Sequence, residues 1–187
     1  MNTHNRNELI KCIQDEKYFI ETYVMDNHPV HGLSTVKLTE KQLAILEQIK
    51  NKTIIIDAIP ERQIGTSFML VAHTLWLAIF NSYQNIHLMG VKVVGAQELR
   101  MRFRIAYEHL PDFLKPARTV DNKYEIAFDH GTVVYFTTSN PSSLKGRPLN
   151  HLLLDTFDEF KAERRLEIYN TAPSGMVKTD LVQLVIV

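Results

Sequence analysis

Residues 53–80 read TIIIDAIPERQIGTSFMLVAHTLWLAIF and are the most informative segment of the chain about its architecture. The run at 53–57 is short, apolar and rich in β-branched residues, which predicts a buried strand. A turn-like stretch, IPERQIG, then leads into apolar residues from Ser67 to Phe80 that predict a helix. A strand, a tight turn and a helix in this order form the repeating unit of parallel α/β sheets.

The segments on either side alternate between strand and helix patterns in the same way. Further strands are expected at 85–91, 124–128, 132–137, 151–155 and 181–187, and helices at 7–25, after Thr39 and at 96–109. A connector at 28–33 separates the first two helices, and Thr39 opens a T-E-K-Q capping pattern. The residues 129–131 (DHG) are a hairpin turn. We therefore predict an α/β domain of three layers, with a mostly parallel central sheet flanked by helices and one β-hairpin.

Composition narrows the classes of protein that remain. The chain has 187 residues with 21 basic and 21 acidic side chains, so the formal net charge is zero. This balance argues against a strongly basic nucleic-acid module, although it leaves room for a local basic patch. The single cysteine, Cys12, excludes an internal disulfide and a cysteine zinc cluster. The longest apolar run, 68–80, is well short of the ~20 residues of a membrane span. We expect a soluble, cytoplasmic protein with no membrane partner.

The junction at 57–67 has the layout of a phosphate-binding loop. Such a loop follows a buried strand and delivers the anion to the start of a helix. Gly65 would permit close backbone approach, and Ser67 stands where a hydroxyl binds Mg²⁺. The full signature G-x-x-x-x-G-K-[ST] is absent, because the first glycine is missing and Thr66 replaces the lysine. An ordinary strand–turn–helix junction that binds nothing is the alternative interpretation.

A second junction lies at HLLLD, residues 151–155. An apolar strand that ends in aspartate can present its carboxylate to Mg²⁺ at the carboxyl edge of a sheet. A hydrolase of this type also needs a glutamate next to the aspartate to activate water. Thr156 occupies that position here, and Asp158 and Glu159 follow it. The alternative is an ordinary strand end, but the two junctions together have the order that a nucleoside triphosphatase requires.

Over its whole length the chain resembles the ATPase domain of tailed-phage terminase large subunits, the motors that package DNA into proheads. Four segments carry the resemblance: HPVHGLSTVKLTEKQ (28–42), ERQIGTS (61–67), AQELRMRFRIAYEHLPDFLKP (96–116) and KYEIAFDHGTVVYFTTSNPSSLKGRPLNHLLLD (123–155). The resemblance implies two parts of the chain. Residues 1–52 would form a helical lead-in that contains the adenine-side segment, and residues 53–187 would form a P-loop NTPase-like core of the ASCE type. The family's coupling motif and C-terminal nuclease domain are expected to be absent.

The resemblance also implies roles for individual residues. Gln42 would face adenine, Arg62 would act on phosphate, and Ser67 and Asp155 would bind Mg²⁺. The implied nucleotide contacts are Gln42, Arg62, Gln63, Gly65, Thr66 and Ser67. Lys145 and Arg147, on either side of Gly146, are candidates for contact with phosphate, DNA or a protein partner, with a simple exposed turn as the alternative.

The departures from the family pattern shape the functional hypothesis. Thr66 replaces the expected lysine, and Thr156 replaces the catalytic glutamate. Some members place the basic residue at the start of the loop, where this chain has Pro60, followed by the acidic Glu61. ATP and Mg²⁺ are the candidate cofactors, but we expect no efficient hydrolysis, because a single catalytic group is worth about 10²–10⁴ in rate.

Three hypotheses follow from this pattern. The first is a degenerate terminase ATPase domain that regulates packaging, or acts as its decoy, through terminase subunits or the portal. The second is an active ATPase module of a split motor that uses Arg62 with Asp158 or Glu159. The third is a fragment with no function of its own. DNA binding is expected to be weak, since nonspecific affinity comes mainly from neutralised phosphates.

Overall fold

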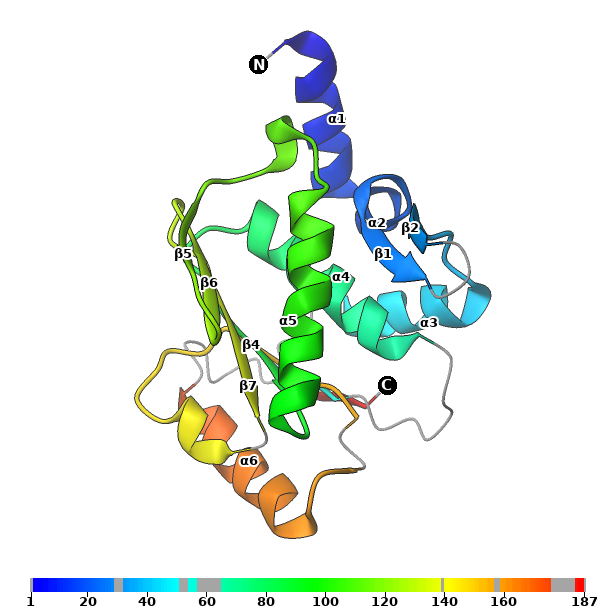
Figure 1. Cartoon of the computed structure of the whole chain (residues 1–187). Coiled ribbons are helices and arrows are strands. Elements are labelled where there is room, and N and C mark those ends of the chain that lie inside the picture. The colour runs from blue at the N-terminus through cyan, green and yellow to red at the C-terminus, as the bar shows by residue number, and fades with distance from the viewer. Residues whose placement is uncertain are drawn as a thin grey trace.

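The computed structural model describes residues 2–28, 32–50, 54–56, 65–138, 140–156, 159–175 and 184–186 (Figure 1). The α-helices are α1 (Thr3–Gln14), α2 (Glu16–Tyr23), α3 (Glu40–Ile49), α4 (Thr66–Phe80), α5 (Val93–Glu108) and α6 (Ala162–Gly175). The strands are β1 (Met25–His28), β2 (Gly32–Thr35), β3 (Ile54–Ile56), β4 (Asn85–Gly90), β5 (Arg118–Asp121), β6 (Glu125–Phe128), β7 (Val133–Thr138), β8 (His151–Leu154) and β9 (Leu184–Ile186). Two short 3₁₀ helices are η1 (Asp112–Leu114) and η2 (Pro141–Leu144).

The central sheet is mostly parallel, as the sequence predicts. Its described strands have the order β5-β6-β7-β4-β8-β3-β9. β8 lies between β4 and β3 and is parallel to both, and β3 is also parallel to β9. Among these described strands only β6 runs against its neighbours, because the predicted hairpin turn reverses the chain between β6 and β7. The residues of that turn include Gly131, which has a φ of +85°.

Helices cover both faces of this sheet. Leu153 and Leu88 pack into the larger core cluster with α4 and α5, whereas Leu152 and Met89 pack into a second cluster with residues of α6. Neighbouring residues of a strand point to opposite faces, so β4 and β8 supply side chains to both clusters. The three-layer α/β architecture is therefore confirmed. Figure 1 shows α1 and α6 at opposite ends of the molecule.

The N-terminal part differs from the sequence prediction. The expectation of one helix over 7–25 is wrong, because the chain breaks at Asp15 between α1 and α2. Asp15 is extended, with φ −131° and ψ 94°, and its carboxylate accepts the N–H of Tyr18 at 3.0 Å. This contact makes Asp15 the N-cap of α2, a role for which aspartate is well suited. The expected connector at 28–33 instead contributes to an antiparallel pair of strands, β1 and β2.

Three other elements extend or add to the predictions. α5 begins at Val93, three residues before the predicted start. The strand β5 and the helix α6 were not predicted. Ion pairs hold β5 against α5: Arg100 of α5 bonds the Asp121 carboxylate, and Arg118 of β5 lies 2.7 Å from the carboxylate of Glu108 on α5. The arginines of α5 are thus partly structural rather than a purely solvated face.

α4 is the central helix of the domain. Twelve of its fifteen residues are buried, including the polar His73 and Thr74. It packs against α5, α3 and α2 and against the sheet strands β4 and β7. Its apolar character therefore reflects a core position in the fold. Within the described segments, no helix has both the length and the apolarity to cross a membrane.

Candidate nucleotide site

The two predicted junctions meet at one edge of the sheet. β3 and β8 are neighbours and parallel, with Ile56 opposite Leu154, so their carboxyl ends lie side by side. Asp155 directly follows β8, and the segment after β3 leads to Gly65 and α4. In open α/β sheets, ligands bind outside the carboxyl ends of the strands. The fold thus brings together residues about ninety positions apart in the sequence.

Gly65 forms the start of α4. It adopts the left-handed conformation, with φ +81° and ψ 28°, and its carbonyl accepts the N–H of Met69 at 3.1 Å. Glycine reaches this conformation without the steric cost that a β-carbon brings. Because Gly65 has no side-chain acceptor, the N-cap residue leaves the first N–H groups of α4 uncapped. Uncapped N–H groups at a helix start favour a bound anion.

Asp155 is held in a buried position beside this helix start. It is 8% exposed, and its backbone N–H donates to the carbonyl of Met89 at 2.9 Å. The hydroxyl of Thr156 donates to its Oδ2 at 3.1 Å, while Oδ1 has no hydrogen-bond partner within the part of the chain that the structure describes. A buried carboxylate oxygen without a partner suits a cation ligand.

The surroundings of Asp155 act on its pKa in opposite directions. Burial raises the pKa of this carboxyl above its usual value, since the charged form loses hydration. Hydrogen bonding from the hydroxyls of Ser67 and Thr156 lowers the pKa in turn, as does the positive charge of Arg102. Ser67 thus lies within reach of the aspartate, as a shared Mg²⁺ site requires. The influence of Arg102 was not predicted, because α5 is distant in sequence.

Thr156 takes an unusual backbone conformation at the position of the expected glutamate. Its φ is +54°, which is rare for a β-branched residue. Such strain concentrates at functional sites. The Thr156 hydroxyl donates to Asp155. Unlike a glutamate, threonine has no carboxylate that could accept a proton from water. The N–H of Glu159 donates to the Thr156 carbonyl at 3.0 Å, and the Glu159 charge raises the pKa of Asp155. A second carboxylate therefore acts on this site.

Gln42 lies against the loop glycine, although the sequence separates them widely. Its Oε1 accepts the N–H of Thr39 at 3.0 Å, which completes the capping box predicted at the start of α3. Its Nε2 stands 2.7 Å from where a β-carbon on Gly65 would be. Gln42 is 7% exposed, so its amide is part of the packed edge of the site. The structure therefore places Gln42, Gly65, Thr66, Ser67 and Asp155 in one region.

The remaining predicted residues are either outside the described part of the chain or in other parts of the described fold. Arg62 and Gln63 lie outside the described residues, as do Pro60, Glu61 and Asp158. Lys145 is exposed and follows η2. The Arg147 guanidinium stacks over the Tyr135 ring at 4.4 Å and lies 3.9 Å from the Glu125 carboxylate. Tyr135 points to the sheet face opposite α4, because its neighbours Val134 and Phe136 belong to the α4 core.

The fold and the arrangement of the site together indicate the class of protein domain. A largely parallel sheet with a glycine-led helix start and a strand-end aspartate at one edge is the arrangement of P-loop NTPase-like α/β domains. No protein-family model matches the sequence.

Solved structures give a more specific likeness. The chain is similar to the HK97 bacteriophage large terminase, with a TM-score of 0.66 and 12% identity over 88% of this chain and 36% of that one. It is also similar to the large terminase of a thermophilic bacteriophage in complex with ADP, with a TM-score of 0.51 and 15% identity over 74% of this chain and 37% of that one. The chain thus spans about a third of each and has the fold of a terminase large-subunit-like domain, as the sequence resemblance implies.

Proposed function

We propose that this chain is a nucleotide-binding, catalytically degenerate terminase ATPase domain that regulates phage DNA packaging, or acts as its decoy, through protein contacts. One observation carries the proposal. Asp155 and Ser67 meet beside an uncapped helix start, while the next residue, Thr156, directs a hydroxyl rather than a carboxylate into the site. The arrangement can hold a nucleotide but lacks its usual water-activating group.

The described residues fit a Mg²⁺-nucleotide. The N–H groups at the start of α4 would receive phosphate oxygens. Ser67 and Asp155 would hold Mg²⁺, which prefers oxygen ligands and here would also neutralise a buried carboxylate. The solved terminase of the thermophilic phage, which shares this fold, is a complex with ADP. Mg²⁺ would supply charge stabilisation for the phosphates, and Arg62 is proposed to add a further positive charge.

Several missing groups argue against efficient turnover. General acid–base catalysis contributes about 10²–10⁴ in rate, and Thr156 cannot act as the base. Thr66 stands in place of the loop lysine and is buried at the first turn of α4. The partners we propose are phage packaging proteins, namely terminase subunits or the portal, in the host cytoplasm. DNA binding is proposed to be weak, given the net charge of zero.

A titration with a fluorescent ATP analogue, with and without Mg²⁺, tests this proposal when phosphate release is followed in the same samples. We expect Mg²⁺-dependent binding without turnover above background. Asp155→Ala should abolish the Mg²⁺ dependence, and Arg62→Ala should weaken binding. Steady hydrolysis that Asp155→Ala removes would overturn the degenerate assignment, and an absence of binding would overturn the nucleotide site itself.

An active ATPase module is the second candidate, and Glu159 is the observation that favours it. The negative charge of Glu159 raises the pKa of Asp155, so the Glu159 carboxylate is a candidate replacement for the missing glutamate. In this case the chain would hydrolyse ATP as one part of a split packaging motor. Glu159→Gln would then lower phosphate release by about 10-fold or more. The matched control Glu163→Gln, which changes an exposed glutamate in the first turn of α6, should leave the rate unchanged.

A further inference from the structure

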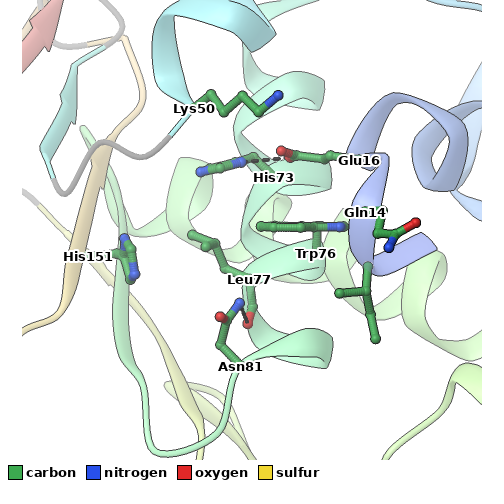
Figure 2. Close-up of a pocket in the computed structure, with 9 residues that line it drawn as sticks. Gln14, Glu16, Lys50, His73, Trp76, Leu77, Asn81 and His151 are labelled. Atoms are coloured by element: carbon green, nitrogen blue, oxygen red, sulfur yellow. Dashed lines mark hydrogen bonds and ion pairs between the residues drawn. The ribbon is translucent and has the colours of Figure 1, made fainter. Parts of the chain in front are cut away.

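A cavity lies beside the C-terminal half of α4, away from the nucleotide site at the start of that helix. Its volume is about 410 Å³ (Figure 2). The residues that line it are Ile13, Gln14, Glu16, Lys50, His73, Trp76, Leu77, Asn81 and His151. Asn81 follows the last residue of α4, whereas Gly65 precedes the first. His73, the lining residue of α4 nearest to Gly65, is eight residues along the chain from it, which at 1.5 Å of rise per residue is roughly 12 Å along the helix. The lining shares no residue with the nucleotide site, so the cavity is separate from it.

The wall of this cavity contains a buried Glu16–His73 pair. The Nδ1 of His73 lies 2.7 Å from Oε1 of Glu16, and the side chains are only 3% and 7% exposed. Nε2 of the same ring has no hydrogen-bond partner among the residues described. Figure 2 shows this nitrogen on the side of the ring away from Glu16, directed toward the open space. Buried polar atoms are normally paired, so the orphaned nitrogen indicates a missing partner.

The other lining groups favour an anion over a metal ion. Lys50 brings an ammonium group to the same cavity, and His151 contributes a second imidazole. An ammonium repels a bound cation, and the described residues contain no group of three His, Cys, Asp or Glu side chains that could hold a metal. An anion would instead be attracted by the Lys50 ammonium.

Apolar and aromatic side chains form the rest of the lining beside His73. Trp76 lies nearly parallel to the His73 ring, with 14° between the planes and 6.4 Å between the centroids. Its indole N–H donates to the carbonyl of Cys12 at 2.9 Å, which fixes the ring in place. Leu77 and Ile13 extend this apolar surface. A ligand of this cavity therefore meets both polar groups and an apolar surface.

We propose that this cavity binds a small organic carboxylate. His73 Nε2–H and Lys50 hold the acid group, and the apolar part of the ligand lies against Trp76 and Leu77. Glu16 is a positioning residue, because its hydrogen bond to Nδ1 sets the orientation of the ring. The site is independent of the proposed nucleotide function.

The single tryptophan of the chain provides a direct readout, since Trp76 lines the cavity. Benzoate is the probe, and benzyl alcohol, of similar shape but uncharged, is its matched control. Benzoate should change the tryptophan emission in a saturable way without nucleotide, and calorimetry should give the same affinity. Benzyl alcohol should bind at least about 10-fold more weakly, because it has no charge to pair with Lys50 and His73.

Three variants locate the site. His73→Gln and Lys50→Met should each weaken benzoate binding at least about 10-fold, whereas Lys123→Met, on an exposed turn, should leave it unchanged. Lys50 is exposed and caps the end of α3, so its variant keeps the test valid if the His73 variant is unstable. Equal binding of benzyl alcohol, a non-saturable response, or unchanged affinity in Lys50→Met would each overturn the proposal. His73-dependent Zn²⁺ binding that excludes benzoate would replace it with a metal site.

Discussion

The amide nitrogen of Gln42 lies 2.7 Å from the point that a β-carbon on Gly65 would occupy. This relationship joins the capping box of α3 to the first residue before α4. The loop glycine is thus required twice, once for its φ of +81° and once for the space that Gln42 fills. The N-terminal segment and the candidate nucleotide site are therefore packed as one unit.

Gly65→Ala should destabilise the protein by roughly 1–3 kcal/mol, because the new methyl group strains the backbone and displaces Gln42. Gln42→Ala should cost about 1 kcal/mol through loss of the capping box. Since Gln42→Ala also opens space for the methyl group, the double variant should be less destabilised than the sum of the two. Urea unfolding of all four proteins measures this coupling, and strict additivity would show that the two side chains do not compete for space.

Asp155→Asn should stabilise the free protein while it removes Mg²⁺-dependent nucleotide binding. The raised pKa of Asp155 means that its ionised form is disfavoured in the fold. The protonated carboxyl therefore contributes its whole stabilising effect below the unfolded pKa of about 4. This contribution is lost as the pH rises through the folded pKa. The variant should therefore gain on the order of 1 kcal/mol at pH 7 and nothing in strong acid. Thermal unfolding across pH checks this, and a destabilised variant at pH 7 would contradict it.

Replacements of Thr156 should separate backbone strain from its hydrogen bond. Thr156→Gly relieves the φ of +54°, whereas Thr156→Val keeps the β-branch and also loses the hydroxyl. The glycine variant should be more stable than the valine variant by about 1–2 kcal/mol. Denaturant unfolding gives the difference, and equal stabilities would mean that the strain is absent.

His87 should make the protein sensitive to mild acid. Burial lowers its pKa to about 4, with a smaller contribution from the positive charge of Arg147 above Tyr135. The neutral ring therefore contributes stability above the unfolded pKa of about 6.5, and this is lost as the pH falls toward the folded value. Between pH 7 and pH 5 the loss from this residue should be roughly 2 kcal/mol.

His87→Leu tests this assignment. Neither ring nitrogen of His87 has a hydrogen-bond partner in the described part of the structure, so leucine removes the titration without breaking a bond there. The variant should lose about 2 kcal/mol less stability than the parent between pH 7 and pH 5. His109→Leu, which changes an exposed histidine, is the control and should keep the parent's profile. An unchanged slope in His87→Leu would exclude this histidine as the cause.

Local sequence signals were sufficient for much of the architecture. The strand at 54–56, the hairpin around Gly131 and the HLLL strand before Asp155 all follow from runs and turns within a few residues. The Thr39 capping box forms as its residue pattern predicts. These features depend on interactions between neighbours, so they are visible in the sequence itself.

Other features depended on contacts that no local pattern contains. The break at Asp15 reflects a side-chain cap inside an otherwise continuous helical pattern, and the polar strands β1 and β2 lack the alternation that marks a half-buried strand. β5 is stabilised by arginines of α5 and α6 by a small second core, both made of residues distant in sequence.

The sequence alone therefore determined the α/β class, the strand-end aspartate and the loop glycine, since each is encoded in a short segment. Only the tertiary structure brought Gln42 against Gly65, Ser67 to Asp155, and Glu16 to His73. The reason is physical: the free energy of these contacts comes from burying and pairing groups that meet only when helices dock on the sheet. Sequence spacing carries no record of that proximity.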